Sequence, residues 1–259
     1  MTQILKPSIL FVQGSFQIPE VYSRLTAALE ARHFHVVHPK LPSLIGQEKP
    51  DFATKSLVED AEAVQSELKR LVEVEGKPVL VVMHSYGGLV GSQAVPEELT
   101  WAKRNEKGLA GGVIHLFYFA AFILTIGQSV LGTFGESSNN IVYPDGRFSL
   151  KDAANILYND LPPKEAQFWE SKIINQSYAV QSTEVTRAAY LYLPSTYMIC
   201  QNDQAAPAQY QEMFAATAHA DILKIEAGHS PWFTKNEELV DSIEKTATEA
   251  FEKLSKDCE

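Results

Sequence analysis

The sequence has few cysteines, no long hydrophobic run and no excess of positive charge. Only two cysteines occur in 259 residues, Cys200 and Cys258, which excludes a disulfide framework and favours a reducing compartment. The apolar stretch near the N-terminus is about six residues long, too short for a signal-peptide core or a membrane span. The net charge of −10 argues against a surface for nucleic acid or for an anionic membrane. These absences predict a soluble, cytoplasmic, globular protein.

Patterns that bind nucleotides and metals are also missing. No Gly-x-x-x-x-Gly-Lys-Ser/Thr motif occurs, and the glycines at 87, 88 and 91 do not have the Gly-x-Gly-x-x-Gly spacing of dinucleotide sites. Two of the histidines at 33, 35 and 38 share one face of a predicted strand, but no third ligand of the right kind is nearby. The sequence therefore predicts neither a metal nor an organic cofactor.

The chain does contain a regular alternation of apolar strands and amphipathic helices. Hydrophobic residues make up 45% of it, enough for a sizeable core. Helical spacing of apolar residues occurs over 19–32, 57–74 and 237–254. Strands are predicted at 8–12, 34–37, 78–83, 112–119, 196–200 and 222–225. Strands that are apolar on both faces and alternate with helices indicate the α/β class, with a mostly parallel, doubly wound sheet.

The alternation stops between residues 124 and 192. This segment carries three prolines and many aromatic residues, and its pattern favours helices and turns rather than strands. It is too long for a structureless loop, so we expect a helical cap over 124–192, inserted into a core made of 1–123 and 193–259. Most of the aromatic residues would form the cap's own small core. A minority would face the crevice at the carboxyl ends of the strands, where open α/β sheets bind ligands.

The stretch LVVMHSYGGLVG, residues 80–91, places Ser85 between a predicted strand and a predicted helix. A turn this sharp strains the serine backbone and needs small neighbours, which the following glycines supply. It lifts the hydroxyl off the sheet and directs the amide of Tyr86, at the positive end of a helix, toward an attacked carbonyl oxygen. This is the small-x-Ser-x-Gly pattern of a nucleophile elbow, with Met83 at the first small position. The alternative is a serine that caps an ordinary helix.

A serine nucleophile needs a histidine base that is held by a buried acid, in the chain order Ser, acid, His. His229, in IEAGHSPWF, lies between the last predicted strand and the last long helix, where such a base belongs. Asp203, in TYMICQNDQAAP, follows the preceding strand. Alone it would be read as an Asx-turn residue, but its order and position favour the acid of a triad. Asp145 and Asp160, both in the cap, are weaker alternatives.

A second oxyanion donor is expected after the first strand. In FVQGSFQIPEVY, Gly14 allows a close approach of the backbone. The amide of Ser15, or as a second choice that of Phe16, would complete an oxyanion hole with Tyr86. The alternative is a plain strand-to-helix turn that bends at the glycine. Contacts with substrate are expected from Gly14, Phe16, Phe134, Trp169 and Trp232.

From ILFVQGSF through VVMHSYGGLVG, FYFAAFI and YMICQNDQAAP to EAGHSPWF, nearly the whole chain resembles the α/β-hydrolase superfamily. It is most similar to the small branch of plant methylesterases and hydroxynitrile lyases, and to small hydrolases encoded in fungal biosynthetic clusters. The resemblance implies a triad of Ser85, Asp203 and His229, with the amides of Ser15 and Tyr86 as the oxyanion hole. Small enzymes of this family are often dimers, so both a monomer and a homodimer remain open.

Two departures from that branch bear on the chemistry. Its cyanide-handling lyases have a threonine at the position of Gly14 and a lysine directly after the base, where this chain has Ser230, so a cyanide leaving group would lack its cation. Gln13 replaces the histidine that is common before the oxyanion glycine. We therefore expect a serine hydrolase that cleaves an ester, lactone or thioester of a small hydrophobic metabolite through an acyl-enzyme. The alternatives are a lyase, cyclase or C–C-cleaving enzyme on the same fold, and a ligand-binding module with a vestigial triad.

Overall fold

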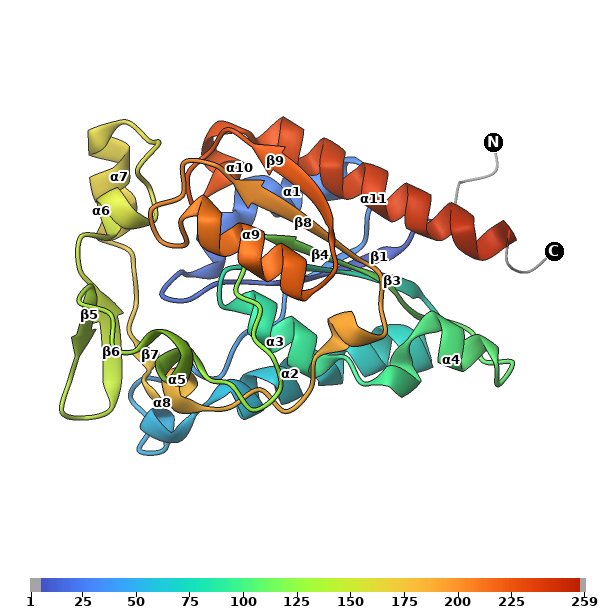
Figure 1. Cartoon of the computed structure of the whole chain (residues 1–259), viewed down its shortest axis with the longest axis horizontal. Coiled ribbons are helices and arrows are strands. Elements are labelled where there is room, and N and C mark those ends of the chain that lie inside the picture. The colour runs from blue at the N-terminus through green and yellow to red at the C-terminus, as the bar shows by residue number, and fades with distance from the viewer. Residues whose placement is uncertain (1–5, 257–259) are drawn as a thin grey trace.

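A six-stranded parallel sheet forms the centre of the molecule (Figure 1). The computed structural model describes residues 6–256. The strand order is β2-β1-β3-β4-β8-β9, and every neighbouring pair is parallel. The strands are Ser8–Val12 (β1), Val36–Val37 (β2), Pro78–His84 (β3), Gly112–Phe119 (β4), Ser195–Cys200 (β8) and Asp221–Ile225 (β9). The predicted fold class is confirmed, and the carboxyl ends of all these strands meet at one edge of the sheet.

Helices cover both faces of the sheet. On one face lie α1 (Ser23–Ala31) and α11 (Asn236–Lys256), and on the other lie α2 (Leu57–Lys69), α3 (Gly87–Ala94) and α9 (Ala208–Thr217) (Figure 1). Each face has its own apolar cluster because side chains alternate along a strand. In β1, Ile9 and Phe11 pack with α1 and α11, whereas Leu10 and Val12 pack with α2 and α3.

The shorter elements adjust the ends of these helices. A 3-10 helix, Pro19–Tyr22, leads into α1, and a π-helical turn, Arg70–Val74, ends the α2 segment. Two further short helices of the core are Trp101–Asn105 (α4) and Pro231–Thr234 (α10). No helix between residues 6 and 256 has the length and apolarity needed to cross a membrane. Cys200 is buried and free, and Cys258 lies outside the described residues.

The segment between β4 and β8 contains a second sheet, which corrects the expectation of helices and turns alone. Its four α-helices are Val130–Phe134 (α5), Ala153–Ile156 (α6), Pro163–Glu170 (α7) and Ala179–Ser182 (α8). Three antiparallel strands accompany them, Asn140–Val142 (β5), Arg147–Leu150 (β6) and Gln176–Ser177 (β7). Strands of two to four residues are too short for an alternating pattern to be detected in the sequence. We call this whole segment, 124–192, the cap.

Candidate active site

Ser85 lies at the sharp turn between β3 and α3, in a conformation that few residues adopt. Its φ is +53°, the left-handed region in which a non-glycine residue is strained. The glycines after it permit the turn, since a Cβ on Gly87 would overlap the carbonyl oxygen of Val12 and a Cβ on Gly88 would overlap that of Phe122. The start of α3 therefore packs directly against backbone, and only glycine fits there.

Met83, the unusual residue at the first small position of the elbow, is accommodated by a third glycine. Its side chain is fully buried and lies over α3 at Gly91. A Cβ at that glycine would be 2.5 Å from the Met83 sulfur, closer than atoms can pack. The thioether thus occupies space that an ordinary helix residue would fill, and the turn keeps its sharp geometry.

The predicted acid and base are joined directly. His229 Nδ1 lies 2.8 Å from Asp203 Oδ2, and both side chains are buried. The other carboxylate oxygen, Oδ1, accepts hydrogen bonds from the amides of Ala205 (2.8 Å) and Ala206 (3.0 Å). Gln211 Nε2 donates to Oδ2 across 3.0 Å. Four hydrogen bonds therefore fix the carboxylate, and the carboxylate in turn fixes the plane of the imidazole.

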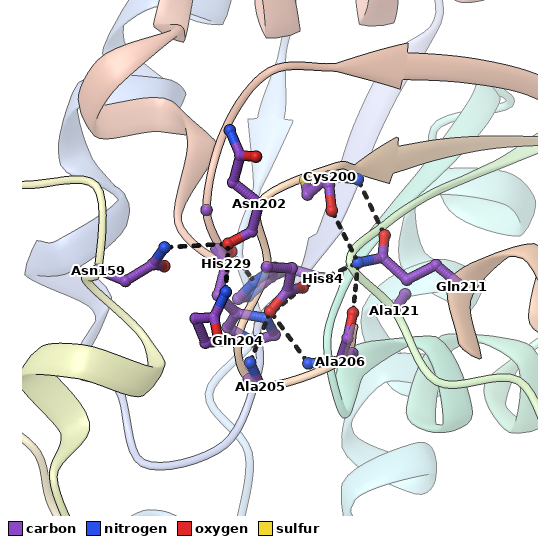
Figure 2. A network of polar contacts seen from close by, with 12 residues as sticks. His84, Ala121, Asn159, Cys200, Asn202, Gln204, Ala205, Ala206, Gln211 and His229 are labelled. Carbon is purple, nitrogen blue, oxygen red and sulfur yellow. Dashed lines mark hydrogen bonds and ion pairs between the residues drawn. The ribbon is translucent and has the colours of Figure 1, made fainter. Parts of the chain in front are cut away.

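The sequence analysis missed Gln211, which holds the acid loop to α9. Its Oε1 accepts from the Cys200 amide at 2.9 Å, and its Nε2 also lies 2.6 Å from the Ala206 carbonyl oxygen (Figure 2). The side chain is fully buried. One signal could have revealed it: Gln211 is the polar residue on the helix face that buries Phe214 and Ala215, three and four positions later.

A cavity of about 420 Å³ lies at the carboxyl edge of the sheet, beneath the cap. Ser85, His229, Ser15 and Tyr86 all line it, so the structure brings the predicted nucleophile, base and oxyanion donors to one place. Within residues 6–256 the Ser85 hydroxyl makes no hydrogen bond with His229. In enzymes without substrate this bond is often long and tightens only in the reactive complex.

The amides expected to form the oxyanion hole are not used elsewhere. In the part of the chain that the structure describes, no hydrogen bond uses the amide of Ser15 or that of Tyr86. The Gly14 amide, by contrast, donates to the Tyr22 hydroxyl at 3.0 Å. A Cβ on Gly14 would lie 2.8 Å from the Ser85 Cβ, so glycine lets the first loop reach the nucleophile.

A second buried histidine, His84, contacts the backbone of the base. His84 Nε2 lies 3.0 Å from the carbonyl oxygen of His229, and its Nδ1 lies 2.9 Å from the Tyr22 hydroxyl. Burial lowers the pKa of His84 far below its ordinary value, and the neighbouring His229 lowers it further. The ring is therefore neutral, and its Nε2–H donates to the carbonyl. His84 thus positions the backbone of the base and does not face the cavity.

Comparison with known proteins assigns the family. A model of the alpha/beta hydrolase family matches residues 9–242. The chain belongs to the alpha/beta hydrolase family. It is 31% identical to alpha/beta hydrolase nvfD of Aspergillus novofumigatus over 265 residues, which cover 96% of this chain and 100% of nvfD. It is 28% identical to the probable hydrolase R7 of a Phoma species over 252 residues, which cover 93% of this chain and 98% of R7.

Solved structures share the fold of this hydrolase. Tomato methylketone synthase I, complexed with 2-tridecanone, aligns with a TM-score of 0.74 at 13% identity, over 95% of this chain and 100% of that one. The Arabidopsis methylesterase MES16 aligns with a TM-score of 0.69 at 17% identity, over 93% and 99%. The predicted resemblance to plant methylesterases and fungal hydrolases is confirmed.

The predicted substrate contacts of the hydrolase separate into two groups. Phe16 and Phe134 line the cavity, and Phe16 has a strained φ of +63°. The structure corrects the prediction for the two tryptophans, since neither is among the described residues that line the cavity. Trp232 is fully buried on the α1 and α11 face of the sheet, and Trp169 packs against Phe233 with ring centroids 5.2 Å apart. Gly14 acts through its closeness to the nucleophile rather than as a lining residue.

The two reserve acids do not contact the base. Asp145 is exposed and pairs with Arg147 across 2.6 Å. Asp160 accepts hydrogen bonds from the Gly228 amide (2.8 Å) and the Thr234 hydroxyl (2.7 Å). Asp203 is therefore the carboxylate that the fold presents to His229, and Asp160 instead touches the residue that precedes the base.

A third buried carboxyl, Asp60 of α2, holds the side chain of Tyr86. The Tyr86 hydroxyl donates to Asp60 Oδ2 at 2.9 Å. The amide of Ser43 donates to Oδ1 at 2.8 Å, and its hydroxyl to Oδ2 at 2.5 Å. Burial is the main influence on Asp60 and raises its pKa to about 6, although these hydrogen bonds oppose the rise. The oxyanion residue is thus anchored through its ring while its amide stays free.

Proposed function

We propose that this hydrolase cleaves an ester, lactone or thioester through a Ser-His-Asp triad and an acyl-enzyme. The observation that carries the proposal is the 2.8 Å bond between Asp203 and His229 beside a cavity that Ser85, with its strained φ, also lines. That bond fixes the imidazole with Nδ1 toward the acid, which leaves Nε2 to take the serine proton.

The reaction would follow in two stages. His229 removes the proton of Ser85 as its oxygen attacks the carbonyl, and the amides of Ser15 and Tyr86 donate to the resulting oxyanion. The imidazolium then gives the proton to the departing alcohol or thiol. Water, activated by the same imidazole, hydrolyses the acyl-enzyme and restores the serine.

The lining of the cavity supports a neutral, hydrophobic substrate. Apart from His229, no lining residue among those described is an acid, a base or a histidine. A carboxylate or ammonium on the ligand would lose its water without gaining an oppositely charged partner, at a cost of several kcal/mol. The apolar part of the lining is formed by Phe16, Phe122, Val130, Phe134, Phe148, Leu150, Ile156, Leu157, Ala205, Ala206, Pro207, Tyr210 and Phe214. We therefore propose a metabolite with an apolar or aromatic body beside the scissile bond.

A fluorophosphonate probe tests whether Ser85 is an activated nucleophile. The wild-type protein should gain the mass of one phosphonyl group, and Ser85→Ala should gain none. Ser15→Ala is the matched control, because it removes another hydroxyl from the same cavity while its backbone amide remains. Absence of labelling in the wild type would overturn the proposal and favour a binding module with an unused triad. Labelling without turnover of any ester would favour lyase or cyclase chemistry.

Paired substrates test the neutral class. p-Nitrophenyl butyrate and mono-p-nitrophenyl succinate differ chiefly in a terminal carboxylate. We expect kcat/KM for the neutral ester to exceed that for the anionic one by roughly 100-fold, because the carboxylate would leave water without gaining an oppositely charged partner. Equal rates for the two esters would contradict the proposed substrate class.

A further inference from the structure

Three consecutive residues of the cap reach three separate loops of the active site. They follow α6 and occupy positions 158–160, directly after Ile156 and Leu157, which line the cavity. Each of the three makes one hydrogen bond to a different loop. The loops are those that carry the oxyanion donor, the acid and the base, which lie far apart in the sequence.

Tyr158 contacts the oxyanion loop. Gln17 Nε2 donates to its hydroxyl at 3.2 Å, and the tyrosine is fully buried. The backbone of the same loop is held to the cap a second time, because the Ile174 amide donates to the carbonyl oxygen of Phe16 at 2.8 Å. Since Phe16 has a strained φ, these bonds help to maintain a conformation that the isolated loop would leave.

Asn159 and Asp160 contact the acid loop and the base loop. Asn159 Nδ2 donates at 2.9 Å to the carbonyl oxygen of Asn202, the residue before Asp203 (Figure 2). Asp160 Oδ2 accepts at 2.8 Å from the amide of Gly228, the residue before His229. The contact is tight, because a Cβ on Gly228 would overlap Asn159 Oδ1. A side chain at position 228 would therefore displace Asn159 from its place against the base loop.

We propose that residues 158–160 form a positioning clamp that sets the distance between the acid and the base and holds the oxyanion loop in register with them. The inference rests on the proposed function. The clamp holds the backbone one residue before Asp203 through an exposed hydrogen bond from Asn159, and one residue before His229 through a half-buried hydrogen bond to Asp160. Displacement of either loop therefore requires a hydrogen bond to break. Ile156 and Leu157, directly before the clamp, line the cavity. The short segment 156–160 therefore contributes both to the shape of the cavity and to the alignment of the triad.

Substitutions at Asp160 test the clamp. Asp160→Ala removes the acceptor for the Gly228 amide and for the Thr234 hydroxyl, whereas Asp160→Asn keeps an acceptor oxygen of the same shape for both. We expect Asp160→Ala to lower kcat and the rate of fluorophosphonate labelling by about 10- to 100-fold, with KM changed less than about threefold. Asp160→Asn should restore both rates to within about threefold of the wild type. Asp145→Ala, which removes an exposed carboxylate elsewhere in the cap, is the matched control and should leave both rates unchanged.

A second variant guards against loss of folding. Asn159→Ala removes the bond to the Asn202 carbonyl and the packing of Oδ1 against Gly228, and it should lower kcat by up to about tenfold with KM retained. Asn155→Ala is its control, since among the described residues the Asn155 side chain bonds only to Asp152, at the surface. Thermal melting of every variant shows whether the fold persists.

The outcomes separate the clamp from the proposed function. If the wild type is not labelled, the proposed function fails. If the wild type is labelled and both alanine variants react at its rate, the clamp is wrong and the triad stands. A fall in rate that Asp160→Asn does not restore, or a change confined to KM, would also overturn the clamp, because neither result is expected from a hydrogen bond that aligns the catalytic groups.

Discussion

The buried carboxyl of Asp60 predicts an unusual dependence of stability on pH. Its pKa is raised from 3.8 to about 6, mainly by burial, so between these values the folded protein keeps a proton that the unfolded chain releases. The free energy of unfolding therefore falls as the pH rises through this window. This is opposite to the usual behaviour of a paired carboxylate, whose folded pKa is depressed.

The size of the effect follows from the two pKa values. At 1.36 kcal/mol for each pKa unit, the ionised side chain costs about 3 kcal/mol above pH 7 relative to a pH below 3.8. Between pH 4.5 and pH 7.5 the free energy of unfolding falls by about 2 kcal/mol of this total. Asp60→Asn cannot titrate, and its amide oxygen can still accept from the Ser43 amide.

Urea unfolding of the wild type and of Asp60→Asn at several pH values measures this loss. Other titrating groups contribute equally to both proteins, so they cancel when the two free energies of unfolding are subtracted. As the pH rises from 4.5 to 7.5, the free energy of unfolding of the variant should increase by about 2 kcal/mol relative to that of the wild type. In the control Asp145→Asn, the free energy of unfolding should fall slightly relative to that of the wild type as the pH rises. The reason is that Arg147 holds the pKa of that exposed carboxylate below its usual range. A difference that stays constant with pH, or that moves toward the wild type, would refute the reasoning.

Three further substitutions test the packing around the nucleophile and the acid. Gly14→Ala places a Cβ 2.8 Å from that of Ser85, so we expect kcat to fall by about 100-fold; an unchanged kcat would show that the loop moves without disturbing the nucleophile. Gly91→Ala should destabilise the protein by about 1 to 3 kcal/mol through overlap with the Met83 sulfur. In a double-mutant cycle, adding Met83→Ala should recover part of this loss, whereas purely additive effects would show that the cost does not come from this overlap. Gln211→Met leaves buried backbone groups without partners, so urea unfolding should reveal a loss of about 3 kcal/mol; a loss below about 1 kcal/mol would mean that water or a neighbour replaces the amide.

The fold was predictable because its signals are repeated along the chain. The strands 8–12 and 112–119 were predicted with the observed bounds, since fully buried parallel strands appear as short, continuous apolar runs. The elbow around Ser85 was predictable for a different reason. A strained turn packed against backbone permits only glycine at defined positions, and such a requirement is visible in one sequence.

The features that the sequence did not predict depend on contacts between residues that are distant in the chain. Gln211 is recognisable as a polar residue on a buried helix face, but its partners come from another loop. The strands of the cap are too short for periodicity, and β7 pairs with a strand well before it in the chain. Trp232 was expected to contact the substrate, yet it lies in α10 and packs in the apolar cluster that contains residues of α1 and α11. The sequence did not show the direction of this side chain.

The hydrogen bonds of residues 158–160 have a consequence for protein engineering. Exchanging lids between related enzymes is a common way to change substrate preference, on the assumption that the lid shapes the pocket and the scaffold supplies the chemistry. In this chain the exchanged piece would also carry the contacts to Gln17, Asn202 and Gly228. A chimera that keeps these three side chains from its host should retain turnover, whereas one that replaces them should bind its new ligand and process it slowly.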